Sequence, residues 1–172
     1  MRVKLVTALL LAVGASGAAS ANIIGGAHAT LRAPDGRVVG GAFIPVTRQT
    51  VMVRLAVRGL SPGRYGVHLH AVGRCEGPDF ASAGAHWNPA GRQHGRLNPH
   101  GSHRGDLPNI EVGANGEGRL EFEIRGDGAW GGSGALFDAD GASILIHAQP
   151  DDERTDPSGN SGPRIACGVL NY

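Results

Sequence analysis

Hydrophobic and polar residues alternate in short stretches along most of this chain. The alternation is clearest in residues 27–32, 40–45, 50–58, 66–71, 119–124 and 143–147. Turn residues bound these stretches, for example Pro34-Asp35-Gly36 and Asn115-Gly116. Because side chains of a strand point alternately to opposite faces, each stretch predicts a half-buried β-strand. Many short strands with frequent turns indicate an all-β fold, an antiparallel β-sandwich or flattened barrel.

Two long stretches break this rhythm. Residues 73–109 are rich in Gly, Pro, Asn and His, and residues 148–164 are polar with an acidic start. Loops of this length in a compact domain usually carry function. The first contains His86, His94, His100 and His103. We therefore expect two long functional loops on the β-scaffold.

The chain begins with the pattern of a secretory leader. Arg2 and Lys4 precede an apolar run over residues 5–13, and small residues end at Ala21. The pattern predicts a signal peptide over residues 1–21 and one domain over residues 22–172. The alternative, a membrane anchor, is disfavoured because the run is shorter than the roughly 20 residues that cross a bilayer. We expect an exported protein, periplasmic where the cell has an outer membrane, with no membrane segment after leader removal.

Charge excludes one class of partner. Removal of Arg2 and Lys4 takes the formal net charge from +1 to −1. Binding to nucleic acid requires clustered cations that neutralise phosphates. A near-neutral mature chain therefore argues against a nucleic-acid partner.

The two cysteines, Cys75 and Cys167, are an even pair in a chain expected to be exported. Thiols outside the cell are normally oxidised, which favours a disulfide over two free buried thiols. A bridge would close a loop of more than half the mature chain, which is worth about 4–5 kcal/mol in the chain-entropy description.

Histidines in the predicted strands suggest copper. His68 and His70 are one residue apart in the stretch 66–71, so both lie on the same strand face. A pair of this kind is not specific alone, because a strand histidine is commonly a half-buried side chain with a satisfied hydrogen bond. His147 ends another apolar stretch and could reach that face from an adjacent strand. Three or four imidazoles in a roughly planar array suit Cu(II).

Histidines in the long loop suggest zinc. His103 and Asp106 are three residues apart in a glycine-containing turn, a spacing that can chelate one ion. With His86 and His94 they give three nitrogens and one carboxylate, a tetrahedral set suited to zinc. His86 could use both ring nitrogens and bridge the two ions, although spacing alone does not prove this.

Six motifs in order carry a resemblance to a known family. They are GVHLHAVGRC, AGAHWNP, RQHG, HRGDLPN, ILIHAQPDD and SGPRIACGVL. Together they resemble the copper/zinc superoxide dismutase family, of the secreted bacterial type, over about residues 27–170. The resemblance implies a Greek-key β-barrel and conversion of superoxide to oxygen and hydrogen peroxide by Cu(II)/Cu(I) cycling.

The resemblance also implies roles for individual residues. The positions matching copper ligands are His68, His70, His147 and the bridging His86, and those matching zinc ligands are His86, His94, His103 and Asp106. Asp151 matches an aspartate that hydrogen-bonds one histidine of each metal. Cys75 and Cys167 match an intrachain disulfide. His86 would deliver a proton, and Arg164 matches an arginine that draws the anionic substrate toward copper; a salt bridge of Arg164 to Asp151 or Asp152 is the alternative.

Other interpretations remain open at this point. The chain could be a non-catalytic exported metal-binding or copper-delivery module, although the motifs keep both the copper positions and Arg164. A copper-only dismutase is disfavoured because the zinc positions are present, and zinc hydrolysis needs an open zinc position with a nearby general base. His28 and His100 are expected to be exposed or capping residues. The family includes monomers and homodimers.

Overall fold

The computed structural model describes residues 23, 25–47, 49–126 and 134–172. The leader predicted for residues 1–21 lies outside these ranges. Within the described ranges the strands are β1 Gly25–Arg32, β2 Val38–Val46, β3 Thr50–Arg58, β4 Gly63–Tyr65, β5 Val67–His70, β6 Ile110–Val112, β7 Glu117–Arg125, β8 Ser143–His147 and β9 Arg164–Val169, with one short 3-10 helix, Ala81–Ala83.

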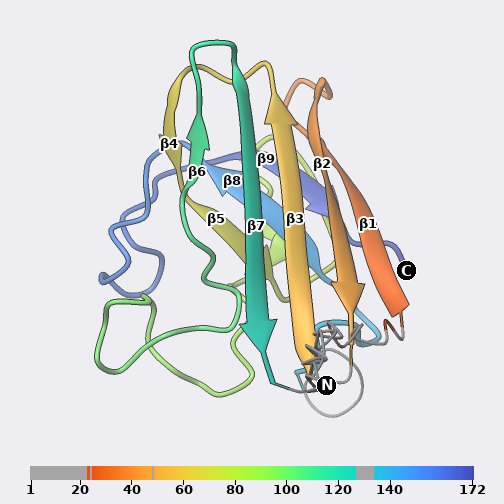
Figure 1. Ribbon diagram of the computed structural model, residues 1–172, viewed down its shortest axis with the longest axis vertical. Coiled ribbons are helices and arrows are strands. Elements are labelled where there is room, and N and C mark those ends of the chain that lie inside the picture. Colours follow the sequence, from red (N-terminus) through yellow and green to blue (C-terminus); the bar gives the residue numbers. More distant parts are fainter. Residues whose placement is uncertain (1–22, 24, 48, 127–133) are drawn as a thin grey trace, which may run out of the picture.

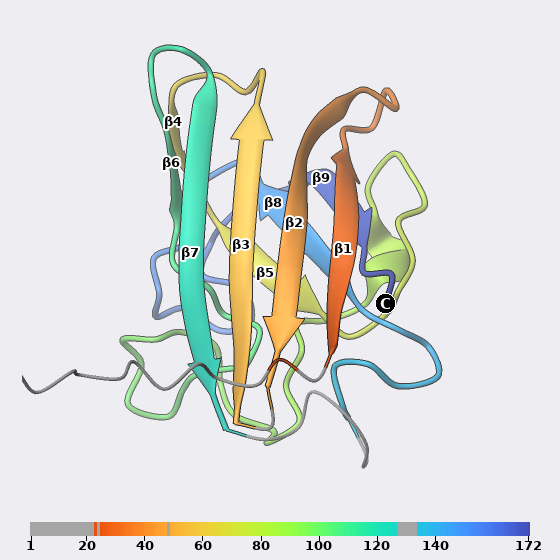
Figure 2. The same ribbon diagram turned by 45° about the vertical axis from the view of Figure 1, so that its right-hand side comes forward.

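All nine strands belong to one antiparallel sheet with the order β4-β6-β7-β3-β2-β1-β9-β8-β5. The end strands β4 and β5 are separated in the chain by Gly66 alone, so the sheet curls until its two ends come close. Figures 1 and 2 show β1, β2, β3 and β7 as one wall, with β5, β8 and β9 behind them. The all-β antiparallel barrel predicted from the alternation is confirmed.

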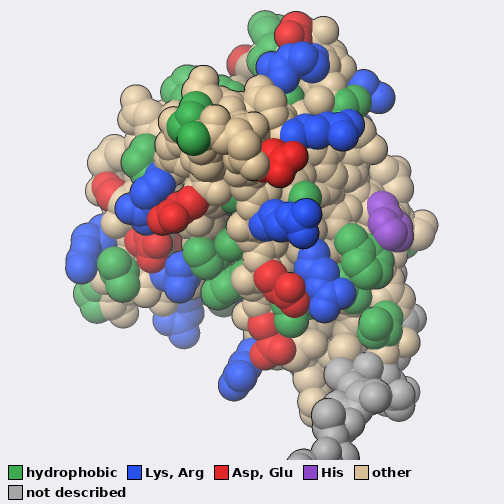
Figure 3. Space-filling model, turned by 45° about the horizontal axis from the view of Figure 1, so that its top comes forward, with side chains coloured by type: hydrophobic (Ala, Val, Ile, Leu, Met, Phe, Trp, Pro, Cys, Tyr) green, Lys and Arg blue, Asp and Glu red, His purple; other side chains and the backbone are tan. Residues whose placement is uncertain are grey.

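The core follows from the alternation of side chains. In β3, Val51, Val53, Leu55 and Val57 are buried inside the barrel, whereas Arg54 is exposed on its outer face. The outer face carries interspersed arginine and acidic side chains (Figure 3). Burial of the apolar half of each strand is the main stabilising contribution, at about 25 cal/mol per Å² of apolar surface removed from water.

The first long loop packs against the outside of the barrel and is fixed by a disulfide. Cys75 bonds to Cys167 of β9, with 5.7 Å between Cα atoms and a sequence separation of 92. Cys167 lies in a small apolar cluster with Phe80, Ala83 and Leu145. The predicted pairing is confirmed, and the alternative of two free thiols is wrong.

The loops also cover the open edge of the sheet. Single β-bridges join His68 to Asp106 and His70 to His86, so the histidine loop continues the sheet beyond β5. All four residues of β5 are buried as a result. Within the described ranges, the structure contains no helix long and apolar enough to cross a membrane.

Candidate metal centre

A ring of three backbone hydrogen bonds brings the histidine-bearing segments together. Leu69 N–H donates to the Gly105 carbonyl (2.9 Å), Trp87 N–H to the Leu69 carbonyl (2.8 Å) and Gly105 N–H to the Trp87 carbonyl (2.9 Å). A Cβ on Gly105 would overlap the Leu69 carbonyl oxygen, so the close approach requires glycine. The chain neighbours of the three residues are His68, His70, His86 and Asp106, among others. The backbone thus fixes where these four side chains begin.

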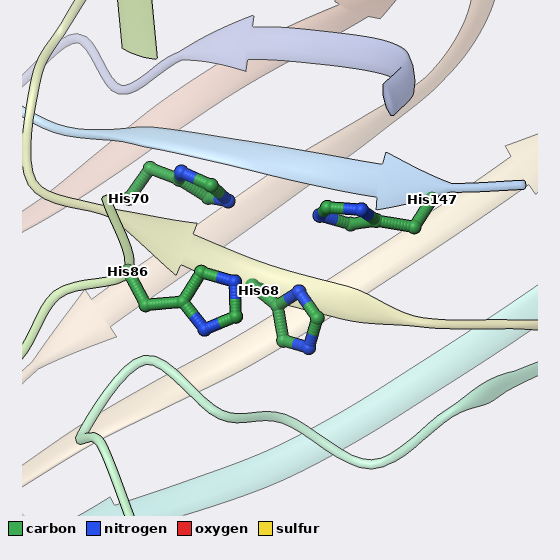
Figure 4. Close-up of side chains that lie close together, drawn as sticks. All are labelled: His68, His70, His86 and His147. Carbon is green, nitrogen blue, oxygen red and sulfur yellow. The ribbon is translucent and has the colours of Figure 1, made fainter. Parts of the chain in front are cut away.

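Four buried imidazoles meet in one place, as Figure 4 shows. His68 and His70 come from β5, His147 ends β8 and His86 comes from the long loop. Their ligand atoms lie within 4.8 Å of one another. The ring centroid of His86 is 3.9 Å from that of His68 and 4.8 Å from that of His70. The structure therefore brings together the four residues predicted for copper.

One nitrogen of each strand histidine is held by the protein and the other is free. His70 Nδ1–H donates to the Gly84 carbonyl and His147 Nδ1–H to the Gly162 carbonyl, both at 3.0 Å, and His68 Nε2–H donates to Asp151 Oδ2 at 2.8 Å. The opposite nitrogens, His68 Nδ1, His70 Nε2 and His147 Nε2, are buried and have no hydrogen-bond partner among the described residues. Hydrogen bonds of this kind fix the tautomer and direct the lone pair of the other nitrogen.

The residues predicted for zinc converge on one carboxylate oxygen. Asp106 Oδ1 lies 3.0 Å from His86 Nδ1, 3.0 Å from His94 Nδ1 and 3.1 Å from His103 Nδ1. The contact between His94 Nδ1 and Asp106 Oδ1 is within ion-pair distance but does not have the geometry of a hydrogen bond. Backbone N–H groups of Gly95 and His103 donate to the other oxygen, Oδ2, each at 2.9 Å. Asp106 is thereby held from one side while Oδ1 and three Nδ1 atoms share one small space.

Burial keeps the strand histidines neutral. It lowers the pKa of His68 to about 3, of His70 to about 2 and of His147 to about 4, because the charged imidazolium loses its hydration. The hydrogen bond to Asp151 only partly opposes this effect at His68. Neutral imidazoles keep the lone pair that a metal requires.

The loop side of the cluster carries negative charge. Burial alone would raise the pKa of Asp106, but hydrogen bonds from His103 and His86 and the close approach of His94 outweigh it and hold that pKa far below its usual range. For His94, burial lowers the pKa, but the adjacent carboxylate of Asp106 and the hydrogen bond to Asp151 prevail and raise it to about 9. The ionised carboxylates therefore favour a cation among these residues.

Asp151 joins the two groups of histidines. Its Oδ2 accepts from His68 Nε2–H at 2.8 Å and its Oδ1 from His94 Nε2–H at 3.0 Å. Asn109 holds the backbone of Asp151: Asp151 N–H donates to Asn109 Oδ1 at 2.7 Å, and Asn109 Nδ2–H donates to the Asp151 carbonyl at 2.9 Å. Sequence reasoning missed Asn109, although it ends the HRGDLPN motif and is an amide suited to pairing with a backbone.

Arg164 lies at the entrance to the histidine cluster. A cavity of about 630 Å³ is lined by His86, His103, His147 and Arg164, among others. Within the described residues, the guanidinium donates to the carbonyls of Phe80 (2.5 Å) and Gly84 (2.6 Å), and no ion pair joins it to Asp151 or Asp152. Gly84 also accepts from His70, so one carbonyl orients both a cluster histidine and the arginine.

The remaining predicted residues lie outside the cluster. Asp152 is exposed and accepts hydrogen bonds from Thr155 and Asn160. His28 is exposed and stacks on Phe43 with 4.6 Å between ring centroids, and His100 is exposed in the loop. The carbonyls of Gly84 and Gly162 were also missed, because a backbone group leaves no signature in side-chain composition.

A family model described as copper/zinc superoxide dismutase matches residues 38–170. Among curated proteins, the chain is 43% identical over 150 residues to a Cu-Zn superoxide dismutase of Caulobacter vibrioides, covering 84% of each chain. It is 41% identical over 149 residues to a Cu-Zn superoxide dismutase of Aquifex aeolicus, covering 84% of this chain and 85% of the other.

Solved structures give a similar result. A crystal structure of a SOD-like protein from Bacillus subtilis superposes with a TM-score of 0.78 at 40% identity, covering 84% of this chain and 97% of that one. Named dismutases and a protein described only as dismutase-like are thus similar to this chain to about the same degree.

Proposed function

The chain belongs to the copper/zinc superoxide dismutase family, and from this premise we infer that it is an oxidoreductase that converts superoxide to oxygen and hydrogen peroxide at the histidine cluster. Two superoxide anions and two protons give one molecule of each product. The observation that carries this proposal is the set of three buried strand nitrogens that face one space and, in the part of the chain that the structure describes, lack hydrogen-bond partners.

The donor set fits the two metals of the family. His68 Nδ1, His70 Nε2 and His147 Nε2 would hold copper together with His86, since imidazoles suit copper. His86, His94, His103 and Asp106 would hold zinc, whose usual ligands are nitrogen and carboxylate oxygen. Leaving several buried polar nitrogens unpaired costs free energy, which a bound metal would recover.

When bound, copper supplies the one-electron oxidation and reduction, and the protein supplies geometry, charge and protons. His86 Nδ1 lies on the Asp106 side, so Nε2 is the nitrogen left for the copper side. We propose that this nitrogen, whenever it is not a ligand, takes a proton from solvent and hands it to the peroxide that forms. The cavity at which His86 lies gives solvent access for that transfer.

Arg164 would attract and orient the substrate. Its guanidinium is fixed by two carbonyl acceptors, and it lines the same cavity as His86 and His147. A fixed cation at the entrance raises the local concentration of a small anion and aims it at the buried cluster.

The function is tested by superoxide decay. The protein loaded with copper and zinc is mixed with superoxide in a stopped-flow instrument, and the measurement is repeated after selective removal of copper. We expect fast, copper-dependent decay close to the diffusional limit. Decay no faster than that of free copper, in a protein shown to hold both metals, would contradict the proposal and favour a non-catalytic metal-binding module.

We further propose that the protein is exported, and periplasmic where an outer membrane exists. Two features support this: the leader pattern of residues 1–21 and the disulfide, a bond typical of oxidising compartments. N-terminal sequencing of the protein from the exported fraction should return a chain beginning at about Asn22, whereas Met1 would contradict the proposal. A monomer or a homodimer is expected, and sedimentation distinguishes them.

A further inference from the structure

The carboxylate of Asp151 occupies a confined position. It accepts hydrogen bonds from His68, from His94 and, at Oδ1, from the backbone N–H of Glu153 at 2.6 Å. The side chain is 1% exposed. The orientation of this carboxylate decides whether His68, proposed for copper, and His94, proposed for zinc, keep their Nε2–H groups hydrogen-bonded. This hydrogen bond keeps the proton on Nε2 and leaves the Nδ1 lone pair for a metal.

Gly159 lies directly against this carboxylate. A Cβ at residue 159 would overlap Asp151 Oδ1 and lie 2.5 Å from Asp151 Cγ and 2.8 Å from His94 Nε2. Gly159 is fixed there by the loop: its N–H donates to the Thr155 carbonyl at 2.6 Å, and its carbonyl accepts from Asp152 N–H at 2.9 Å. A methyl group at this position therefore cannot be accommodated without moving the Asp151–His94 hydrogen bond.

Backbone conformation alone does not explain the glycine. Gly159 has a φ of +63°, in the left-handed region that favours glycine. The same loop, however, holds Glu153 at φ +59° and Asn160 at φ +51°, so side-chain-bearing residues adopt this conformation here. What distinguishes residue 159 is its approach to the Asp151–His94 bond.

We propose that Gly159 is a positioning residue for both the copper ligands and the zinc ligands. Because it has no side chain, the Asp151 carboxylate can reach His68 and His94 at once and hold both rings in the orientation for metal binding. The inference rests on the proposed function, since it takes these histidines as ligands. It predicts that an alanine at residue 159 weakens metal binding mainly through Asp151, whose Oδ1 the added Cβ would overlap, while the same Cβ would also approach His94 Nε2 to 2.8 Å.

The test compares two glycines with the same backbone conformation. Gly91 has a φ of +59°, and a Cβ added there would meet no atom within 4 Å, so Gly91→Ala introduces the same conformational cost without a clash. Dissociation constants for Zn(II) and Cu(II) are measured by competition with chelators. We expect Gly159→Ala to weaken zinc binding about 10–100-fold, the usual effect of losing a residue that supports a metal ligand. Gly91→Ala should bind both metals like the wild type.

A spectroscopic readout separates positioning from general destabilisation. In the reduced Cu(I), Zn(II) protein, which is diamagnetic, the Nε2–H protons of His68 and His94 should give NMR signals typical of hydrogen bonds to a carboxylate. In Gly159→Ala these two signals should shift or exchange away, whereas the Nδ1–H signals of His70 and His147, which donate to backbone carbonyls, should remain.

A double-mutant cycle then tests whether Gly159→Ala weakens metal binding through Asp151. In the Asp151→Ala background the overlap with the carboxylate is absent and only the approach to His94 Nε2 remains, so adding Gly159→Ala should cause a much smaller loss of zinc affinity than in the wild type. If Gly159→Ala does not fold alone, recovery of folding in the double variant supports the same conclusion.

Three outcomes would overturn the inference: zinc affinity of Gly159→Ala equal to that of Gly91→Ala, additive losses with Asp151→Ala, or failure of both the single and the double variant to fold. Failure of the proposed function is distinct, because it would appear as the absence of superoxide decay in a wild type that holds both metals, whereas this test measures metal affinity.

Discussion

In β3, buried Val53 and Leu55 alternate with exposed Arg54 and Arg58, whereas in β5 every residue is buried, including His68 and His70. One face of β3 is in contact with water, so a side chain there needs no particular partner. Neither face of β5 is, so each of its polar atoms requires a hydrogen bond or a metal. The barrel wall is thus stabilised mainly by apolar packing, and the cluster by partners from distant segments. Changes in the wall should alter stability, and changes in the cluster should alter metal binding.

The largest effect should follow from His147→Ala. The variant removes one of the free buried nitrogens from the end of β8. Copper-dependent superoxide decay should fall to the level of the copper-free protein, and copper content should fall with it. Far-UV circular dichroism should be unchanged. Wild-type activity in this variant would exclude His147 as a copper ligand.

The converse change in the wall is Ile44→Ala. Ile44 is fully buried in the core of β2, and truncation should lower the free energy of unfolding by about 2–5 kcal/mol. Urea denaturation measures this loss. Copper and zinc affinities of the folded variant should match the wild type, and a parallel loss of metal affinity would show that wall and cluster are not separable.

Arg164→Glu should act on substrate capture alone. Reversal of the charge at the cavity should slow superoxide decay at low salt, by about tenfold or more, and remove the normal decrease of the rate with ionic strength. Stopped-flow measurements between low and physiological salt test this, with metal content as the control. A rate and salt dependence identical to wild type would remove Arg164 from this role.

Acid should destabilise the metal-free protein through the cluster. His68, His70 and His147 have pKa values of about 3, 2 and 4 in the folded chain, against about 6.5 when unfolded. Between pH 6.5 and 4 the unfolded chain therefore binds protons that the folded chain does not, and stability falls as pH falls. His94, whose pKa is raised to about 9, is protonated in the folded chain throughout this window and in the unfolded chain below about pH 5.5, so it opposes the trend only near the upper end of the window.

Replacement of one of these histidines isolates its contribution to the pH dependence of the unfolding free energy. In His147→Gln, the slope of unfolding free energy against pH should decrease by up to about 1.4 kcal/mol per pH unit, the effect of one proton. Urea titrations of the metal-free proteins from pH 4.5 to 6.5 measure both slopes. Equal slopes would show that His147 does not titrate differently in the two states.

The smallest effect is expected on the outer wall. Arg54 and Glu121 form an exposed ion pair with 3.3 Å between Nε and Oε1. Arg54→Ala should change the unfolding free energy by about 0–1 kcal/mol and leave superoxide decay unaltered. A loss of several kcal/mol would mean that the wall also depends on specific polar partners.

The difference between the barrel wall and the histidine cluster also determines which features could be predicted from the sequence. The predicted strands 50–58 and 143–147 coincide with β3 and β8, because their apolar residues extend over several positions. β4 and β6, three residues each, are too short to show alternation and were not predicted. β9, with the sequence RIACGV, was also missed, since its apolar residues do not alternate regularly with polar ones.

In the cluster, the side chains could be proposed from sequence because imidazole and carboxylate groups at chelating spacings are the donors that copper and zinc use. Their orientation could not. The carbonyls of Gly84 and Gly162 select the tautomers of His70 and His147, and any residue supplies such a carbonyl. Only the path of the folded chain determines which carbonyl stands behind which ring.

The hydrogen-bond ring of Leu69, Trp87 and Gly105 has a consequence for the dynamics of the protein. Each amide proton of the ring is protected from solvent by a different segment, so separation of any one segment from the other two breaks two of the three bonds at once. Departure of the long loop from β5 breaks the Leu69–Gly105 and Trp87–Leu69 bonds together, so the amides of Leu69 and Trp87 should become exposed in a single event and share one free energy of opening. The Gly105–Trp87 bond joins two parts of the loop and should report its own opening. Metal that ties the loop to the strand should slow exchange at Leu69 and Trp87 by the same factor. Two amides far apart in the chain would then report, as one kinetic unit, how often the loop leaves the strand.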